Sequence, residues 1–445
     1  MAHRAGLWFL DLCAAVIALL LIGSPTSATA NVLNVEQIES PRGIKAWLVE
    51  EHSIPLVAIR FSFAGGSTQD GPGKAGLTSL MADVLGEGAG DLSAAQFKER
   101  VALLGARLSA FSRRDAIHGS LEVLAARVRP AGDLLRQMLI SPHFAATDVD
   151  RVKAQRLTDI ARTANEPTKI ALERWYAEAF AGHPYANPVD GTATSIASLT
   201  SADLKGAHSR LFTKDTLKVV IVGDIDKAAA TETLDALFGE LPDKARLVPV
   251  ATVKPRPAEL PVVVDREFPL ATAAFGLASL PVNHPDYAAL QVLNQIIGSG
   301  DFDSRLMDEI RVKRGLAYSI QTNLEQEPLA SFMIGAFATK NENMQQALRV
   351  VRDVLAHTAS AGPTLAEFEN AKRYLTGSFL LDYDTSGRVA ASLMRIWLEG
   401  EGPEAIAKRR ERINKVALGD VKRVARQVLQ ADQLLVTIVG KPTPP

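Results

Sequence analysis

LKVVIVG at residues 217–223 returns as LLVTIVG at residues 434–440, and these two stretches decide the fold. Each is a run rich in β-branched residues that ends in glycine, which is typical of a buried strand. Each also follows a helix-like stretch that begins at an aspartate, Asp203 in the first copy and Asp420 in the second. The constant offset of 217 residues indicates an internal duplication of the 445-residue chain.

Earlier segments repeat at a similar spacing. An apolar strand is predicted over residues 56–64 and another over 271–280, and an amphipathic helix follows each of them. Between the copies, five prolines disfavour regular structure. We therefore predict a domain over residues 31–241, a proline-rich linker over 242–261 and a second domain over 262–445.

The helical signals set the fold class. After the first predicted strand, apolar residues recur at the 3.6-residue period of one helix face, at Leu77, Leu80, Met81, Val84 and Leu85. Each half then reads as strand, helix, strands, long helices, and a final helix and strand. We expect an α+β fold of two similar sandwich domains in a clamshell, each a mainly antiparallel sheet covered by helices.

The first thirty residues follow the secretory pattern, with a basic start, an apolar run from residue 7 to 23 and the exit Ala28–Ala30. An uncleaved membrane anchor is the alternative, but Asp11 shortens the clean apolar run to about a dozen residues, too few to span a bilayer. We expect export, most simply to a periplasm, with no stable membrane anchor after cleavage. The balance of 49 Lys and Arg against 50 Asp and Glu argues against a nucleic-acid partner.

Several catalytic motifs are missing. Residues 71–76 satisfy G-x-G-x-x-G, but Pro72 removes a backbone donor and no parallel βαβ pattern surrounds the loop, so we predict no nucleotide site. The only cysteine, Cys13, lies in the leader, which excludes cysteine catalysis in the exported chain. The histidines beyond the leader are scattered, so they predict no zinc site of their own.

Motifs in both halves resemble the pitrilysin/insulinase family of metallopeptidases. In the first half they are Phe63–Ser67, Gly76-Leu77, His183–Tyr185, Gly191-Thr192 and Val219–Asp224. In the second half they are Gly298–Leu306 and Glu309–Tyr318. The family fold is a pair of similar α+β domains, which agrees with the repeat.

The resemblance also implies a lost zinc site. Active members carry H-x-x-E-H on the helix after the first strand. Here Ser79 and Asp83 stand at the two histidine positions, Ala82 stands at the glutamate position, and Thr158 stands at the position of the third ligand. One carboxylate cannot hold a catalytic zinc ion, so we expect no metal or other cofactor in this chain.

A second family feature is kept. The resemblance implies that Arg311 and Tyr318, seven residues apart, bind the substrate backbone. Gly315 ends the predicted helix, so Arg311 falls in its last turn and Tyr318 early in the next strand, which would aim both polar ends into one cleft. The phenol would donate to the oxyanion. The structural alternative is that Arg311 serves the helix dipole while Tyr318, sharing a strand face with Leu316 and Ile320, packs in the core.

Together these features imply an exported, zinc-free subunit of a heteromeric zinc metallopeptidase. It would not be active alone, and it would form a heterodimer with a zinc-bearing homologous subunit that hydrolyses peptides. The partner would hold the zinc ion and its water, while this chain binds substrate. One alternative is a non-catalytic peptide-binding or assembly scaffold of the same fold. Another is a self-sufficient hydrolase with unfamiliar metal ligands.

Overall fold

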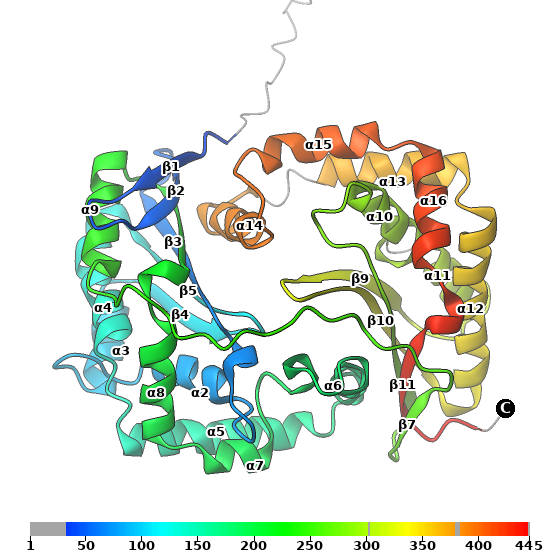
Figure 1. The fold of residues 1–445 in the computed structure, drawn as a ribbon, viewed down its shortest axis with the longest axis horizontal. Helices are drawn as coiled ribbons and strands as arrows, with labels where there is room; N and C mark the ends of the chain where they lie inside the picture. The colour runs from blue at the N-terminus through cyan, green and yellow to red at the C-terminus, as the bar shows by residue number, and fades with distance from the viewer. Residues whose placement is uncertain (1–32, 301–302, 379–382, 444–445) are drawn as a thin grey trace, which may run out of the picture. The chain divides into compact units, whose positions relative to one another are not determined.

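The computed structural model of the chain describes residues 33–300, 303–378 and 383–443. The predicted leader, residues 1–30, lies outside the described residues. The chain divides into two units, Met1–Asn34 and Val35–Pro445, and the second unit holds two sheets with their covering helices (Figure 1). In the described ranges, no helix has both the length and the apolar character that crossing a membrane would require.

The two sheets share one topology. The first runs β1-β2-β6-β3-β5-β4 and the second β7-β11-β8-β10-β9. Among the described strands, β2–β6 and β7–β11 pair in parallel, while the other neighbours are antiparallel. The bounds are β1 Glu36–Glu39, β2 Lys45–Glu50, β3 Leu56–Ala64, β4 Arg107–Ser112, β5 Ala116–Leu124, β6 Leu217–Gly223, β7 Val262–Asp265, β8 Leu270–Ala278, β9 Ile320–Glu327, β10 Ala330–Lys340 and β11 Leu435–Gly440. The second sheet therefore repeats the first without β1, and the predicted α+β duplication is confirmed.

The helices that precede β6 and β11 begin in the same way. They are α8, Ser201–Leu211, and α16, Leu418–Val428. Asp203 and Asp420 each hold the third position of their helix, and each carboxylate accepts a hydrogen bond from the backbone N–H of the residue just before the helix. The repeated aspartate is thus a helix cap that satisfies a donor left unpaired at the helix start.

Apolar helix faces cover the outer side of each sheet. The positions predicted on one face, Leu77 to Leu85, are buried in the first core. Helices with buried residues in the first core are α2 Leu77–Val84, α3 Ala94–Leu103, α4 Val128–Ile140, α5 Ala146–Thr163, α7 Ala193–Ser198, α8 and α9 Lys227–Phe238. Those of the second core are α10 Tyr287–Asn294, α11 Arg305–Met307, α12 Met344–Ala361, α13 Leu365–Gly377, α15 Ala405–Lys415 and α16.

The inner side of each sheet is covered by a helix from the other half of the sequence. Helix α6, Pro167–Ala179, packs on β8 and β11, and α14, Ser386–Leu398, packs on β3 and β6 (Figure 1). The Trp175 indole N–H on α6 donates to the Leu435 carbonyl at 3.2 Å. Neither half of the sequence thus supplies all the layers around its own sheet.

The proline-rich segment 242–261 contains no helix or strand, as expected. It is nevertheless tied to the first half by side chains. The Gln69 amide and the Val248 backbone exchange two hydrogen bonds, at 2.7 and 3.1 Å. His183 Nε2 lies 2.9 Å from the Ala251 carbonyl oxygen. The segment is therefore a connection held in place along its course.

Candidate functional site

Helix α2, which carries the degenerate zinc motif, is capped by an acidic side chain. The Asp70 carboxylate accepts the backbone N–H of Gly76 at 2.8 Å and of Thr78 at 2.9 Å. Burial raises the pKa of Asp70 to about 7. The carboxylate therefore takes the place at the helix start that a phosphate would take in a dinucleotide-binding turn.

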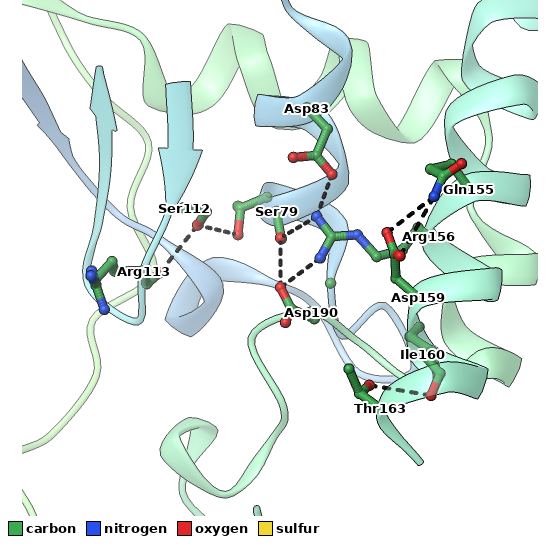
Figure 2. A network of polar contacts seen from close by, with 12 residues as sticks. Ser79, Asp83, Ser112, Arg113, Gln155, Arg156, Asp159, Ile160, Thr163 and Asp190 are labelled. Carbon is green, nitrogen blue, oxygen red and sulfur yellow. Dashed lines mark hydrogen bonds and ion pairs between the residues drawn. The ribbon is translucent and has the colours of Figure 1, made fainter. Parts of the chain in front are cut away.

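Two of the degenerate positions, Ser79 and Asp83, meet at one cation (Figure 2). Ala82 is buried and supplies no polar group. The cation is the guanidinium of Arg156, which extends from α5 and bonds the Ser79 hydroxyl through Nη2 at 3.1 Å. The same Nη2 donates to Asp83, and Nη1 donates to Asp190 at 2.6 Å.

Thr158, the residue we predicted at the third ligand position, lies elsewhere. Its side chain is exposed, and its hydroxyl donates to the Ala154 carbonyl one turn back on the same helix, at 3.0 Å. An α-helix rotates by about 100° per residue, so the two-residue step from Arg156 to Thr158 is a rotation of about 200°. The two side chains therefore lie on opposite faces of α5. Arg156 and Asp190 are the residues that the sequence reasoning missed.

The residues at this position do not fit a zinc ion. A catalytic zinc site needs three ligands among His, Cys, Asp and Glu, with an open fourth position. Within the described part of the chain, no group of three or more such side chains is arranged to hold a metal. The centre of the cluster is instead filled by a guanidinium. Although burial opposes its charge, Asp83 and Asp190 raise the pKa of Arg156 further above its usual range, so it stays protonated.

The retained pair, Arg311 and Tyr318, is brought together. Arg311 lies in a π-helical turn, η7 (Asp308–Val312), and Gly315 then adopts a left-handed φ of +61°, which ends the helical segment. The Arg311 guanidinium carbon lies 4.3 Å from the centre of the Tyr318 ring, which is cation–π distance.

Tyr318 lies neither in the predicted strand nor in the core. The residue comes two positions before β9, in a bend and outside the strand where we had placed it. Its side chain is 80% exposed, so the alternative that it packs in the core is wrong. A large exposed aromatic ring held under an arginine offers a surface for binding.

A cavity of about 970 Å³ opens beside β9 and α14. Its described lining does not include Arg311 or Tyr318, so the expectation that both point into one cleft is not met by this cavity. The charged side chains that line it are Arg60, Arg113, Asp115, His118, Lys218, Glu325, Glu327, Arg395 and Glu399. Burial raises the pKa of Glu327 to about 7 and lowers that of His118 to about 4, so at these two positions burial opposes the charged form of the side chain.

Known proteins are similar to this chain in sequence and in fold. Residues 46–193 match the family model "Insulinase (Peptidase family M16)", and residues 198–375 match "Peptidase M16 inactive domain". A "Non-peptidase homolog YmxG" from Helicobacter pylori is 28% identical over 369 residues, covering 82% of this chain and 84% of that protein. A probable mitochondrial-processing peptidase subunit beta from Schizosaccharomyces pombe is 25% identical over 354 residues, covering 76% of each.

A solved structure agrees with these matches. The crystal structure of a peptidase M16 inactive domain from Pseudomonas fluorescens superposes with a TM-score of 0.87 at 26% identity, covering 93% of this chain and 98% of that one. This chain belongs to the M16 (insulinase) peptidase family.

Proposed function

We propose that the chain is an exported, zinc-free subunit of a heteromeric M16 metallopeptidase. A zinc-bearing homologous subunit supplies the metal, its bound water and the general base. This chain supplies Arg311 and Tyr318, which hold the peptide backbone and donate a hydrogen bond to the oxyanion that forms during hydrolysis.

One observation carries this proposal. Tyr318 is 80% exposed and stacked with Arg311, whereas the metal position on the same chain is filled by Arg156. Leaving a tyrosine ring in water gains nothing for folding, since burying an aromatic side chain is favourable. An ordered, exposed Arg/Tyr pair therefore supports a binding role.

Pairing with a zinc-bearing chain is supported by a relative. The Schizosaccharomyces pombe protein is described as a subunit of a processing peptidase, so a similar chain works within a larger assembly. In such an assembly the zinc ion would act on water, and this chain's side chains would orient the peptide bond.

The experiment mixes this chain with its zinc-bearing homologue and follows hydrolysis of a fluorogenic peptide. Tyr318→Phe removes the phenol donor alone, and we expect kcat to fall by about 10²-fold, the usual effect of losing one oxyanion donor. Tyr374→Phe is the matched control, because Tyr374 is also exposed but lies on α13. Gel filtration checks that both variants still form the complex.

The alternative function, a peptide-binding or assembly scaffold, predicts a different result. Turnover would then be unchanged in Tyr318→Phe, and the subunit role would be rejected. Stoichiometric zinc and peptidase activity in this chain alone would point instead to a self-sufficient hydrolase. Export has its own test, since the mature chain should be found in the periplasmic fraction and begin after Ala30.

A further inference from the structure

The Arg156 guanidinium joins three separate segments of the first half. Ser79 and Asp83 come from α2, Arg156 comes from α5, and Asp190 lies between the turn Pro184–Ala186 and α7, Ala193–Ser198. Figure 2 shows the guanidinium at the centre, with the three oxygen-bearing side chains around it. The Arg156 side chain is only 16% exposed.

Arg156 neutralises the negative charge of the carboxylates around it. Asp83 and Asp190 both ion-pair with it, and the Ser79 hydroxyl donates to Asp190 at 3.3 Å. Lys169 is a second cation near these oxygens, and its Nζ lies 3.6 Å from Asp190. Without the guanidinium, Asp83 would be a half-buried carboxylate that has lost the cation paired with it, which destabilises the fold.

A planar guanidinium is well suited to pairing with two carboxylates at once. Its two terminal nitrogens point in different directions, so each can serve a different carboxylate, whereas a lysine ammonium acts as a single point charge. Here Nη1 serves Asp190 while Nη2 serves Asp83 and Ser79. One side chain therefore draws together oxygens from several segments, which is what a structural metal ion does in other proteins.

We propose that Arg156 is a built-in cation that fastens these segments to one another, as a structural metal ion does in other proteins, and that closes the position to zinc. The guanidinium ties α2 to α5 and to the segment around Asp190, so these segments are held together without a metal. This inference does not depend on the proposed subunit function, because it concerns only the stability and metal response of the isolated chain.

The test compares thermal unfolding midpoints of the purified chain. Arg156→Ala should lower the midpoint by about 3–8 °C, because it removes the cation paired with the half-buried Asp83 and one of the two cations beside Asp190. Arg162→Ala is the matched control, since Arg162 lies on the same helix but is 67% exposed, and its midpoint should change by less than about 1 °C.

Chemical rescue distinguishes a bound cation from general packing. Methylguanidinium chloride at about 20 mM should restore part of the midpoint of Arg156→Ala, while sodium chloride at the same ionic strength should not. Equal effects of the two salts, or an Arg156→Ala midpoint no lower than that of the control, would overturn the proposal.

Two further measurements use the Arg156→Lys variant and the response of the wild-type chain to EDTA and zinc. If Arg156→Ala does not fold, Arg156→Lys decides, because a lysine reaches fewer of the oxygens and should give a midpoint below that of the wild type. A wild-type midpoint in Arg156→Lys would count against the proposal. The wild-type chain itself should respond neither to EDTA nor to equimolar zinc chloride, and a rise with zinc would show that the position is open to metal.

Discussion

At the scale of single residues, the role of a side chain in this protein depends more on its surroundings than on its residue type. Arg156 and Arg311 are both helical arginines, yet one is sequestered among carboxylates and the other lies over an exposed tyrosine. Glu327 shows the same principle for acids. It lines the cavity beside β9, where burial and the carboxylates Asp115 and Glu325 oppose its ionisation.

Glu327 predicts a pH-dependent stability. Burial, Asp115 and Glu325 raise the pKa of Glu327 in the fold to about 7, from 4.5 in an unconstrained chain, although Arg114 and Arg113 act in the opposite direction. The folded state thus holds the proton more tightly than the unfolded state. The stability that this protonated carboxyl supplies is complete below pH 4.5 and is lost as the pH rises through about 7.

Glu327→Gln keeps a neutral side chain at every pH. We expect it to raise the free energy of unfolding at pH 8 by at least about 1 kcal/mol, and to have a smaller effect at pH 5. Urea unfolding at the two pH values measures the difference, with the exposed Glu259→Gln as control. A variant that is less stable than wild type at pH 8 would contradict the prediction.

At the scale of elements, α14 is held at both ends by charges from the first half. The Glu122 carboxylate, paired with Arg60, lies at the start of the helix beside Gly387. At the other end, the Lys218 ammonium donates to the Trp397 carbonyl at 2.7 Å. An anion at the N-terminus and a cation at the C-terminus both complement the helix dipole, which favours docking of α14 on this sheet.

The glycines that close β6 and β11 are required by backbone geometry. Gly223 and Gly440 have φ values of +140° and +142°, which residues with a Cβ rarely adopt. A Cβ on Gly223 would lie 2.1 Å from the Leu56 carbonyl oxygen on the neighbouring strand. The repeated glycine of the sequence is therefore a structural necessity of the sheet.

Substitution of Gly223 should consequently be severe. We expect Gly223→Ala to lower the free energy of unfolding by about 3 kcal/mol or more, through backbone strain and the clash with β3. Gly206→Ala is the control, because Gly206 lies within α8 with open space around it, and should be neutral or stabilising by up to about 1 kcal/mol. Chemical denaturation measures both, and equal effects would reject the geometric explanation.

At the scale of the whole molecule, the exchange of helices joins the two halves into one folding unit. The core at α6 combines Trp175 and Phe180 of the first half with Phe332 and Leu435 of the second. On the other sheet, Trp397 of α14 stacks on Trp47 with the ring centres 4.8 Å apart. Separating the halves would expose both of these apolar contacts to water.

This arrangement predicts that the two halves fold only together. A fragment of residues 262–445 lacks α6, so it should bind the dye ANS and unfold without cooperativity when expressed alone. Co-expression with residues 31–241 should restore a cooperative transition and a soluble complex of the two fragments. Cooperative unfolding of the 262–445 fragment by itself would show that the exchanged helix is dispensable.

Much of the fold could be predicted because it is local. The strand at residues 217–223 and the helix from Leu77 follow from side-chain periodicity, and the duplication follows from the repeated aspartate and glycine. The contacts of the candidate site were harder to predict from the sequence. Thr158 was chosen by its place along the chain, whereas Arg156 reaches the cluster because of the direction in which it leaves α5.

By itself, the sequence determined that the chain is a duplicated α+β protein, that Ser79, Ala82 and Asp83 have lost the zinc motif, and that Arg311 and Tyr318 are present. The tertiary structure alone decided that Arg156 bonds Ser79, Asp83 and Asp190, that the ring of Tyr318 faces water, and that a helix from each half covers the sheet of the other. These features depend on contacts between residues far apart in the chain, and periodicity carries no information about which distant faces will meet.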